Sequence, residues 1–208
     1  DYRYCWLRDA TFTLYALMVS GYHDEASAWR DWLLRSAAGD PAKLQVMYGA
    51  AGERRLDEFT VGWLAGYERS SPVRVGNGAV GQFQLDIYGE VLDAVYLYDK
   101  WRQGLEPQQW KALAQLVEYA AAHWREPDES IWEVRGGPKQ FTYSKVLCWV
   151  ALDRGVTLAR RYTLPGPVAA WEHTRDESRA TVMQQGYNTA IHAFAQTVNG
   201  HVLDARLL

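Results

Sequence analysis

Apolar residues recur along much of the chain at the three-to-four-residue spacing that places side chains on one face of an amphipathic helix. A first stripe covers residues 7–18, and Gly21 is expected to end that helix. Asp24 is the expected N-cap of a second helix, whose apolar face covers residues 26–37. The pattern therefore predicts that the chain begins with two helices joined by a short turn.

Further helices are predicted in the rest of the chain. One apolar stripe covers residues 85–96, and Pro107 occupies an expected first helical position before a stripe at residues 110–124. Another helix is predicted at residues 144–162, and a more polar one begins near Pro167. The predicted fold class is all-α, built from antiparallel helical hairpins.

Long irregular segments separate these helices, at residues 45–81, 126–142 and 186–200. The first is expected to form a small extended hairpin that turns at residues 51–52. Loops longer than about 12 residues are uncommon in compact domains unless they have a function. We therefore expect one domain, residues 1–208, with a site in loops gathered at one end of a helical bundle or barrel.

Composition excludes several classes of partner. The net charge is −3, from 22 basic and 25 acidic residues that are not gathered in blocks, so neither nucleic acid nor an anionic membrane is expected as a partner. No apolar run approaches the roughly 20 residues of a membrane span. The 10 Trp and 13 Tyr suit surfaces that are partly apolar and partly wet, as sugars are, although most of the Trp are expected to pack between helices.

The two ends are interpreted as cuts in a longer protein. The chain lacks an initiator Met and closes on apolar residues, whereas natural termini are usually polar. The absence of a signal peptide then gives no information on localisation, and the sequence predicts no oligomeric state. Cys5 and Cys148 form no CxxC pair, lie among apolar neighbours and are expected to be buried free thiols, with a disulfide left open.

Signatures of metal, nucleotide and serine-hydrolase chemistry are missing from the sequence. The five His residues form no HxxxH or HExxH pair, and there is no GxSxG, P-loop or GxGxxG motif. No cofactor or metal site is therefore predicted. The remaining chemical groups are carboxylates among aromatic residues, which are the residue types that glycoside hydrolysis uses.

Glu133 is the strongest candidate for a catalytic residue. It follows Trp132 and precedes Val134 and a Gly pair in the segment SIWEVRGG. A carboxylic acid beside an indole in an apolar pocket resists ionisation, which suits a general acid. The alternative is a surface ion pair with Arg135, and the local sequence does not separate the two interpretations.

Arg8 and Asp9 are the second candidates, at the start of an apolar helix and shortly after three aromatic residues, Tyr2, Tyr4 and Trp6. Adjacent residues point in different directions, so the two charges need not pair and could hold neighbouring hydroxyls of one sugar. The alternative is that Asp9 complements the helix dipole while Arg8 faces solvent.

The third candidate segment is NGAVGQFQLDIYGE, where Gln82, Gln84, Asp86 and Glu90 lie near the start of a helix. Taken alone, this segment favours a solvated helix face over a binding site.

Several segments together resemble family 15 of the glycoside hydrolases, the glucoamylase and bacterial trehalase-like group. They are DYRYCWLRDATFTLYALM, ERRLDE, PVRVGN, QLDIYGEVLDA, IWEVRGGPKQFTYSKVLCWVALDR and GYNTAIHAFAQTVNGHVLDARLL, and they span essentially the whole chain. The resemblance implies an (α/α)6 barrel with its site in loops at one end. It also implies inverting hydrolysis of α-glucosidic bonds at a non-reducing glucose end, on an α-linked disaccharide or oligosaccharide.

The resemblance also implies roles for individual residues. Glu133 matches the general acid, and Arg8 and Asp9 match the pair that holds the non-reducing glucose. The other residues implied in substrate binding are Tyr2, Trp6, Gln82, Asp86 and Trp132. Fungal glucoamylases commonly have a second Glu after the acid, where this chain has Val134 and then Arg135. The contact to the leaving sugar is therefore expected to differ, and Arg135 joins the candidate binding residues.

The general base is expected to lie outside this chain, in a motif of the family that the chain does not reach. Inversion requires that base about 6.5–9.5 Å from the acid, with a water between them, so the segment alone is expected to be inactive. A catalytically inactive carbohydrate-binding or scaffold domain is the alternative, although such a domain needs no buried acid. A phosphorolytic enzyme on the same barrel is a third possibility.

Overall fold

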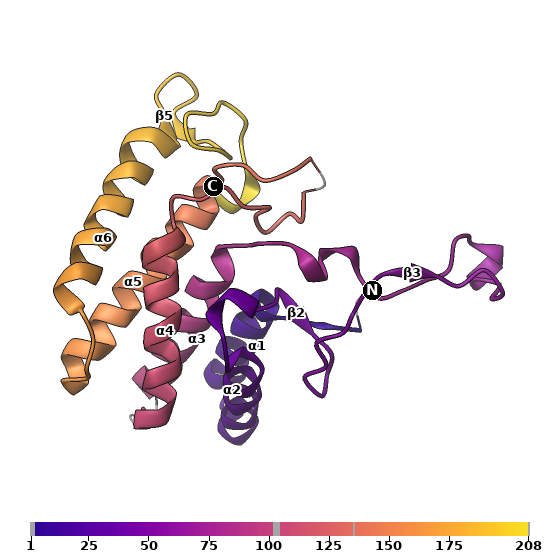
Figure 1. The fold of residues 1–208 in the computed structure, drawn as a ribbon, viewed down its shortest axis with the longest axis horizontal. Helices are drawn as coiled ribbons and strands as arrows, with labels where there is room; N and C mark the ends of the chain where they lie inside the picture. The colour runs from indigo at the N-terminus through magenta and orange to yellow at the C-terminus, as the bar shows by residue number, and fades with distance from the viewer. Residues whose placement is uncertain (1–2, 102–104, 135, 208) are drawn as a thin grey trace.

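The structure is a computed structural model that describes residues 3–101, 105–134 and 136–207. The described part contains six α-helices and only small pairs of strands (Figure 1). The helices are α1 (Leu7–Val19), α2 (His23–Ala37), α3 (Asp86–Trp101), α4 (Pro107–His123), α5 (Thr142–Tyr162) and α6 (Val168–Thr181). The prediction of an all-α fold is confirmed.

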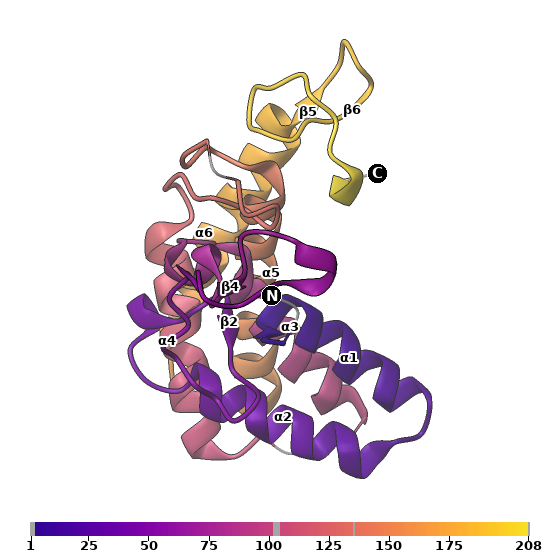
Figure 2. The ribbon, with the colours of Figure 1, turned by 90° about the vertical axis from the view of Figure 1, so that its right-hand side faces the viewer.

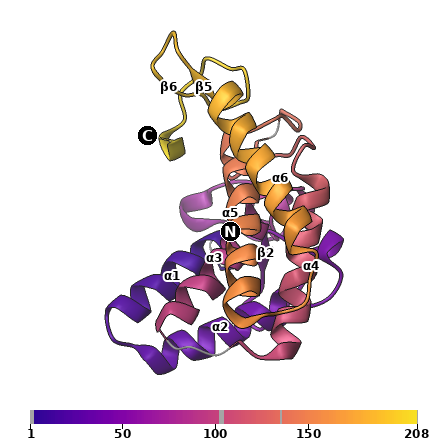
Figure 3. The same cartoon turned by 90° about the vertical axis from the view of Figure 1, so that its left-hand side faces the viewer.

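The helices are arranged as consecutive hairpins in two layers. Each odd-numbered helix packs against the helix that follows it, and α3 lies between α1 and α5 in an inner layer (Figure 2). On the outer side α4 contacts α5 and α6, as the view from the opposite side shows (Figure 3). This arrangement fits part of an (α/α)6 barrel.

The helix boundaries follow the apolar pattern closely, with one difference at the start of α2. Tyr22, not Asp24, is the N-cap residue, and Asp24 lies in the first helical turn. There its carboxylate complements the positive end of the helix dipole, so the residue favours the same helix start by a different interaction.

Short strand pairs fix the loops to one another. β1 (Cys5–Trp6) pairs with β2 (Met47–Tyr48), β3 (Phe59–Thr60) with β4 (Arg74–Val75), and β5 (Tyr187–Asn188) with β6 (Ala193–Phe194).

The turn expected at residues 51–52 does form, because the Gly49 N–H donates to the Glu53 carbonyl. The strand before the turn, however, pairs with β1 rather than with the strand after it. This long-range pairing anchors Trp6 at the start of α1.

The core lies between the inner helices and their outer partners. Leu7 and Leu14 of α1, Leu92 of α3 and Leu152 of α5 are fully buried. The inner helices approach closely at Gly89, where a Cβ would lie 2.2 Å from the Leu147 carbonyl oxygen. Glycine is therefore required there by the close approach of α3 to α5. Cys148 is a buried free thiol in the same core, as expected, whereas the free thiol of Cys5 is only partly buried.

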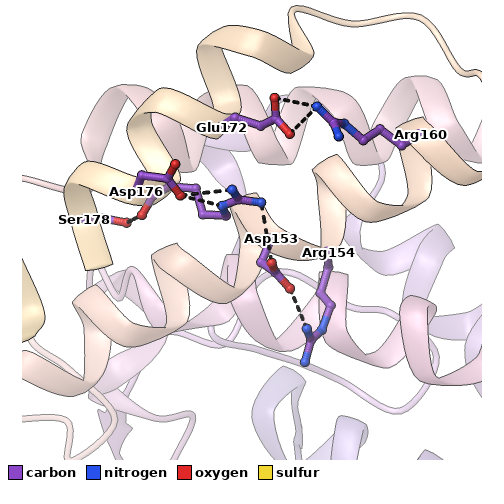
Figure 4. Close-up of polar contacts among 7 residues, drawn as sticks. Asp153, Arg154, Arg160, Glu172, Asp176 and Ser178 are labelled. Carbon is purple, nitrogen blue, oxygen red and sulfur yellow. Dashed lines mark hydrogen bonds and ion pairs between the residues drawn. The ribbon is translucent and has the colours of Figure 1, made fainter. Parts of the chain in front are cut away.

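Ion pairs join the exposed faces of α5 and α6 (Figure 4). Arg160 of α5 lies 2.6 Å from Glu172 of α6, and Asp153 of α5 lies 3.8 Å from Arg175 of α6. Asp153 also pairs with Arg154 at 2.7 Å. Exposed pairs contribute about 0–1 kcal/mol each, so they orient the two helices while apolar packing holds them together.

One apolar strip of α1 remains uncovered, as expected for an open part of a barrel. Phe12, Tyr15 and Val19 are all about half exposed. Across the described residues, the helices lack the combination of length and apolar character that crossing a membrane requires.

Candidate active site

A cavity of about 710 Å³ opens beside the first turns of α1 and the loop between α4 and α5. It is lined by Tyr4, Cys5, Trp6, Arg8, Asp9, Ala10, Thr13, Trp29, Asn77, Ile131, Trp132 and Glu133. The fold thus brings Arg8, Asp9, Trp132 and Glu133 into one concavity, although Trp6 and Glu133 lie 127 positions apart in the sequence.

The Glu133 carboxyl contacts two groups from the start of the chain. Its Oε1 accepts a hydrogen bond of 2.7 Å from Trp6 Nε1 and lies 3.9 Å from Arg8 Nη2. The side chain is 27% exposed, so the carboxyl is neither a free surface group nor sealed in the core. The alternative partner considered for it, Arg135, lies outside the described residues.

The backbone of the loop that carries Glu133 adopts an uncommon conformation. Glu133 has a φ of 52° and Ser130 a φ of 59°, in the left-handed region that residues other than glycine rarely enter. Each such residue costs on the order of 1 kcal/mol or more, and such strain gathers at functional sites where the surroundings enforce it.

A buried carboxyl holds this loop in place. Asp128 is fully buried, and its Oδ2 accepts hydrogen bonds from Leu85 N at 3.0 Å, Ser130 N at 3.3 Å and Ser144 Oγ at 2.6 Å. Asp128 also exchanges two backbone hydrogen bonds with Lys139 across the loop. The loop is thereby tied to the beginnings of α3 and α5, which positions Glu133 over the cavity.

Arg8 and Asp9 lie closer to each other than expected. Arg8 Nε is 3.6 Å from Asp9 Oδ2, so the expectation that these adjacent charges point apart is corrected. The Arg8 side chain is only 14% exposed, whereas that of Asp9 is 70% exposed. Arg8 therefore bridges Asp9 and Glu133 at the wall of the cavity, and the Asp9 carboxylate is available to a ligand.

The two tryptophans near Glu133 have different roles from those that the sequence indicates. Trp6 Nε1 donates to the Glu133 carboxyl, whereas Trp132 Nε1 donates to both carboxylate oxygens of Asp204 at 2.9 Å. Trp132 is half exposed and presents its ring to the cavity. Sequence reasoning missed Asp204, because no local pattern distinguishes it from a surface residue near the end of the chain.

Two further aromatic residues of the cavity wall were also missed. Trp29 Nε1 donates to the Ala10 carbonyl at 2.8 Å, and the Tyr4 hydroxyl accepts from Gly76 N at 3.1 Å. Both side chains are therefore held in place at the cavity wall.

The remaining sequence candidates divide into three cases. Gln82 lines a separate, smaller cavity that also borders Glu133. Asp86 is fully buried and lines neither cavity, so its assignment to direct substrate contact is corrected. Tyr2 and Arg135 lie outside the described residues.

Comparison with known proteins identifies the family. The model of glycosyl hydrolases family 15 matches residues 1–208. This chain belongs to that family. The family assignment agrees with the resemblance found in the sequence motifs and with the all-α structure.

Curated relatives match all or much of the chain. A trehalase of Mycobacterium tuberculosis is 44% identical over 100% of this chain and 31% of its own length. A trehalase of Thermoplasma acidophilum is 34% identical over 100% of this chain and 36% of its own. An isomaltose glucohydrolase of Kribbella flavida is 33% identical over 62% of this chain and 33% of its own. The chain thus spans about a third of the length of these relatives, and no solved structure matches it.

Three carboxyl groups lie buried beneath the site of this family 15 chain. Asp86, Glu90 and Asp128 are each at most 4% exposed, so the expectation of a solvated helix face at the start of α3 is wrong. Burial, together with the neighbouring carboxyls of Asp128 and Glu90, raises the pKa of Asp86 to about 7. Burial also raises the pKa of Glu90 to about 7, opposed by a 2.9 Å hydrogen bond from the Tyr143 hydroxyl.

These shifts predict how stability depends on pH. Because the folded chain binds these protons more tightly than the unfolded chain does, their contribution is complete below about pH 4 and is lost as the pH rises through about 7. Between pH 5 and pH 8 the wild type should therefore lose at least about 1 kcal/mol of unfolding free energy relative to Asp86→Asn. Urea unfolding of both proteins at the two pH values measures this difference, and equal slopes would contradict it.

Metal binding receives no support from the described part of the chain. It contains no group of three or more His, Cys, Asp or Glu side chains that could hold a metal ion.

Proposed function

We propose that this chain provides the general acid and the glucose-binding groups of an inverting α-glucosidase that hydrolyses trehalose. The main support is the environment of Glu133, whose carboxyl accepts from Trp6 at 2.7 Å and borders the cavity that holds Arg8 and Asp9. Trehalose is the proposed substrate because relatives that match the whole chain at up to 44% identity are trehalases.

In this proposal Glu133 protonates the glycosidic oxygen as the bond breaks. The Trp6 N–H occupies Oε1, which leaves Oε2 to carry the proton. After the transfer, Arg8 at 3.9 Å stabilises the carboxylate that forms. Proton transfer and charge compensation thus come from groups that are already in place.

The glucose that is transferred to water is proposed to lie against Arg8 and Asp9. The exposed Asp9 carboxylate accepts hydrogen bonds from sugar hydroxyls, and the Trp132 ring offers an apolar surface to a sugar C–H face. The base that activates water is proposed to come from outside this chain, about 6.5–9.5 Å from the acid.

The products of trehalose hydrolysis test this function. Inversion converts one glucose to the β anomer and releases the other as the α anomer, so NMR of the first products of the full-length protein should show equal amounts of both. We expect kcat/KM for trehalose to exceed that for maltose or isomaltose by about 10-fold or more, a difference of about 1.4 kcal/mol in transition-state binding.

Three results would contradict this function. Two α-anomers from trehalose would mean retention, and glucose 1-phosphate formed in the presence of phosphate would mean phosphorolysis. Binding of trehalose without any turnover would favour the inactive binding domain.

A further inference from the structure

Glu133 lies between two cavities. The larger, of about 710 Å³, contains Arg8 and Asp9, and the smaller, of about 280 Å³, contains Glu58 and Gln82. Among the residues that line the two cavities, Glu133 and Asn77 are common to both. The proposed acid thus borders both cavities.

A general acid that cleaves a disaccharide donates its proton to the oxygen that joins the two sugars. One sugar must therefore lie on each side of the donor. We propose that the smaller cavity binds the leaving sugar and that Glu58 is its specificity-determining residue. This inference rests on the proposed function, because it takes Glu133 as the acid and the larger cavity as the site of the glucose that is transferred to water.

The polar groups of the smaller cavity are held in fixed positions. Glu58 Oε2 accepts a hydrogen bond of 3.3 Å from Gly78 N, and Asn77 Oδ1 accepts one of 2.8 Å from Ala79 N. These bonds leave the second carboxylate oxygen of Glu58 to accept from a hydroxyl and the amide N–H of Asn77 to donate to one. A neighbouring acceptor and donor complement two adjacent hydroxyls of a pyranose.

The backbone also fixes the distance between these groups. Residues 59–75, from β3 to β4, form an arm that projects from the helices (Figure 1). Glu58 directly precedes β3 and Asn77 follows β4 by two positions, so both lie at the base of this arm. Asn77 N donates to the Leu56 carbonyl at 2.9 Å, which closes the base of this arm. On the other side, Gln82 Nε2 donates at 3.4 Å to the Val134 carbonyl, directly after the acid. The smaller cavity is therefore connected to the acid's loop.

The size of the cavity indicates the class of leaving group. About 280 Å³ is just below the range of about 300–1,000 Å³ typical of small-molecule sites, which suits one sugar ring rather than a chain of several. The preferred leaving group is therefore a single neutral hexose.

The test is Glu58→Gln in the full-length protein, assayed with two substrates. The amide oxygen can still accept from Gly78 N, so the loop is kept while the anionic acceptor is lost. With trehalose we expect kcat/KM to fall about 10-fold, mainly through a higher KM, as for the loss of one hydrogen bond to a charged group. With α-glucosyl fluoride, whose leaving group does not occupy the smaller cavity, the change should be less than about 2-fold.

Glu118→Gln is the matched control, since Glu118 is an exposed residue of α4 that lines neither cavity. Equal losses with both substrates would place Glu58 on the glucose side or in the fold and would overturn the inference. Unchanged trehalose kinetics in a protein that hydrolyses trehalose would also overturn it, while leaving the proposed function intact. Absence of hydrolysis by the wild type would remove the proposed function and this inference together.

Discussion

Glu133→Gln is expected to lower the turnover of trehalose by about 10²–10⁴-fold, the usual contribution of a general acid. The amide cannot donate an acidic proton to the departing oxygen. Its carbonyl oxygen can still accept from Trp6 Nε1, which lies 2.7 Å from the native carboxylate. The substitution therefore removes the proton and keeps the position of the side chain, and steady-state kinetics on the full-length protein measure the loss.

The nature of the leaving group separates acid catalysis from binding. A sugar alkoxide departs poorly without a proton, whereas fluoride needs no proton from an acid. The Glu133→Gln protein should therefore retain most of its activity toward α-glucosyl fluoride. If the activity fell equally with trehalose and with the fluoride, Glu133 would be a binding or supporting residue, and the proposed mechanism would be wrong.

The sequence predicted the helices well because their pattern is local. Apolar spacing located the described helices, and Pro107 and Gly21 marked boundaries by their own backbone preferences. The partner of β2 could not be predicted, since a two-residue strand has no periodicity, and its pairing with β1 joins segments about 40 positions apart. Long-range pairing of short segments depends on how the helices pack first.

The sequence indicated which residues meet in the cavity better than it indicated how their side chains interact. Family motifs indicated Arg8, Asp9 and Glu133, and the fold brings them into one cavity. Which indole contacts the acid depends instead on side-chain direction, and the sequence favoured Trp132 over Trp6. The carboxyls at the start of α3 were misjudged because adjacent polar residues are typical of a solvated face, whereas here they are buried and Tyr143 of α5 contacts Glu90.

Asp128 is the residue whose loss should most affect both the fold and the site. Asp128→Ala leaves three donors without their acceptor, namely Leu85 N, Ser130 N and Ser144 Oγ. A buried donor without a partner costs about 1–3 kcal/mol, so we expect the free energy of unfolding to fall by about 3–5 kcal/mol. Urea denaturation followed by tryptophan fluorescence measures this loss.

Asp128→Asn is the matched control. All three donors bond to Oδ2, and Oδ1 has no hydrogen-bond partner among the described residues, so one amide oxygen can replace the whole arrangement. Burial raises the pKa of the Asp128 carboxyl, which means that the site penalises the negative charge and needs only the acceptor. Asp128→Asn should therefore have a free energy of unfolding within about 1 kcal/mol of that of the wild type.

Because Asp128 Oδ2 also holds Ser130, three positions before Glu133, Asp128→Ala should also lose trehalose turnover under conditions where it remains folded. Equal stability of the two variants would show that the three hydrogen bonds do not hold the loop.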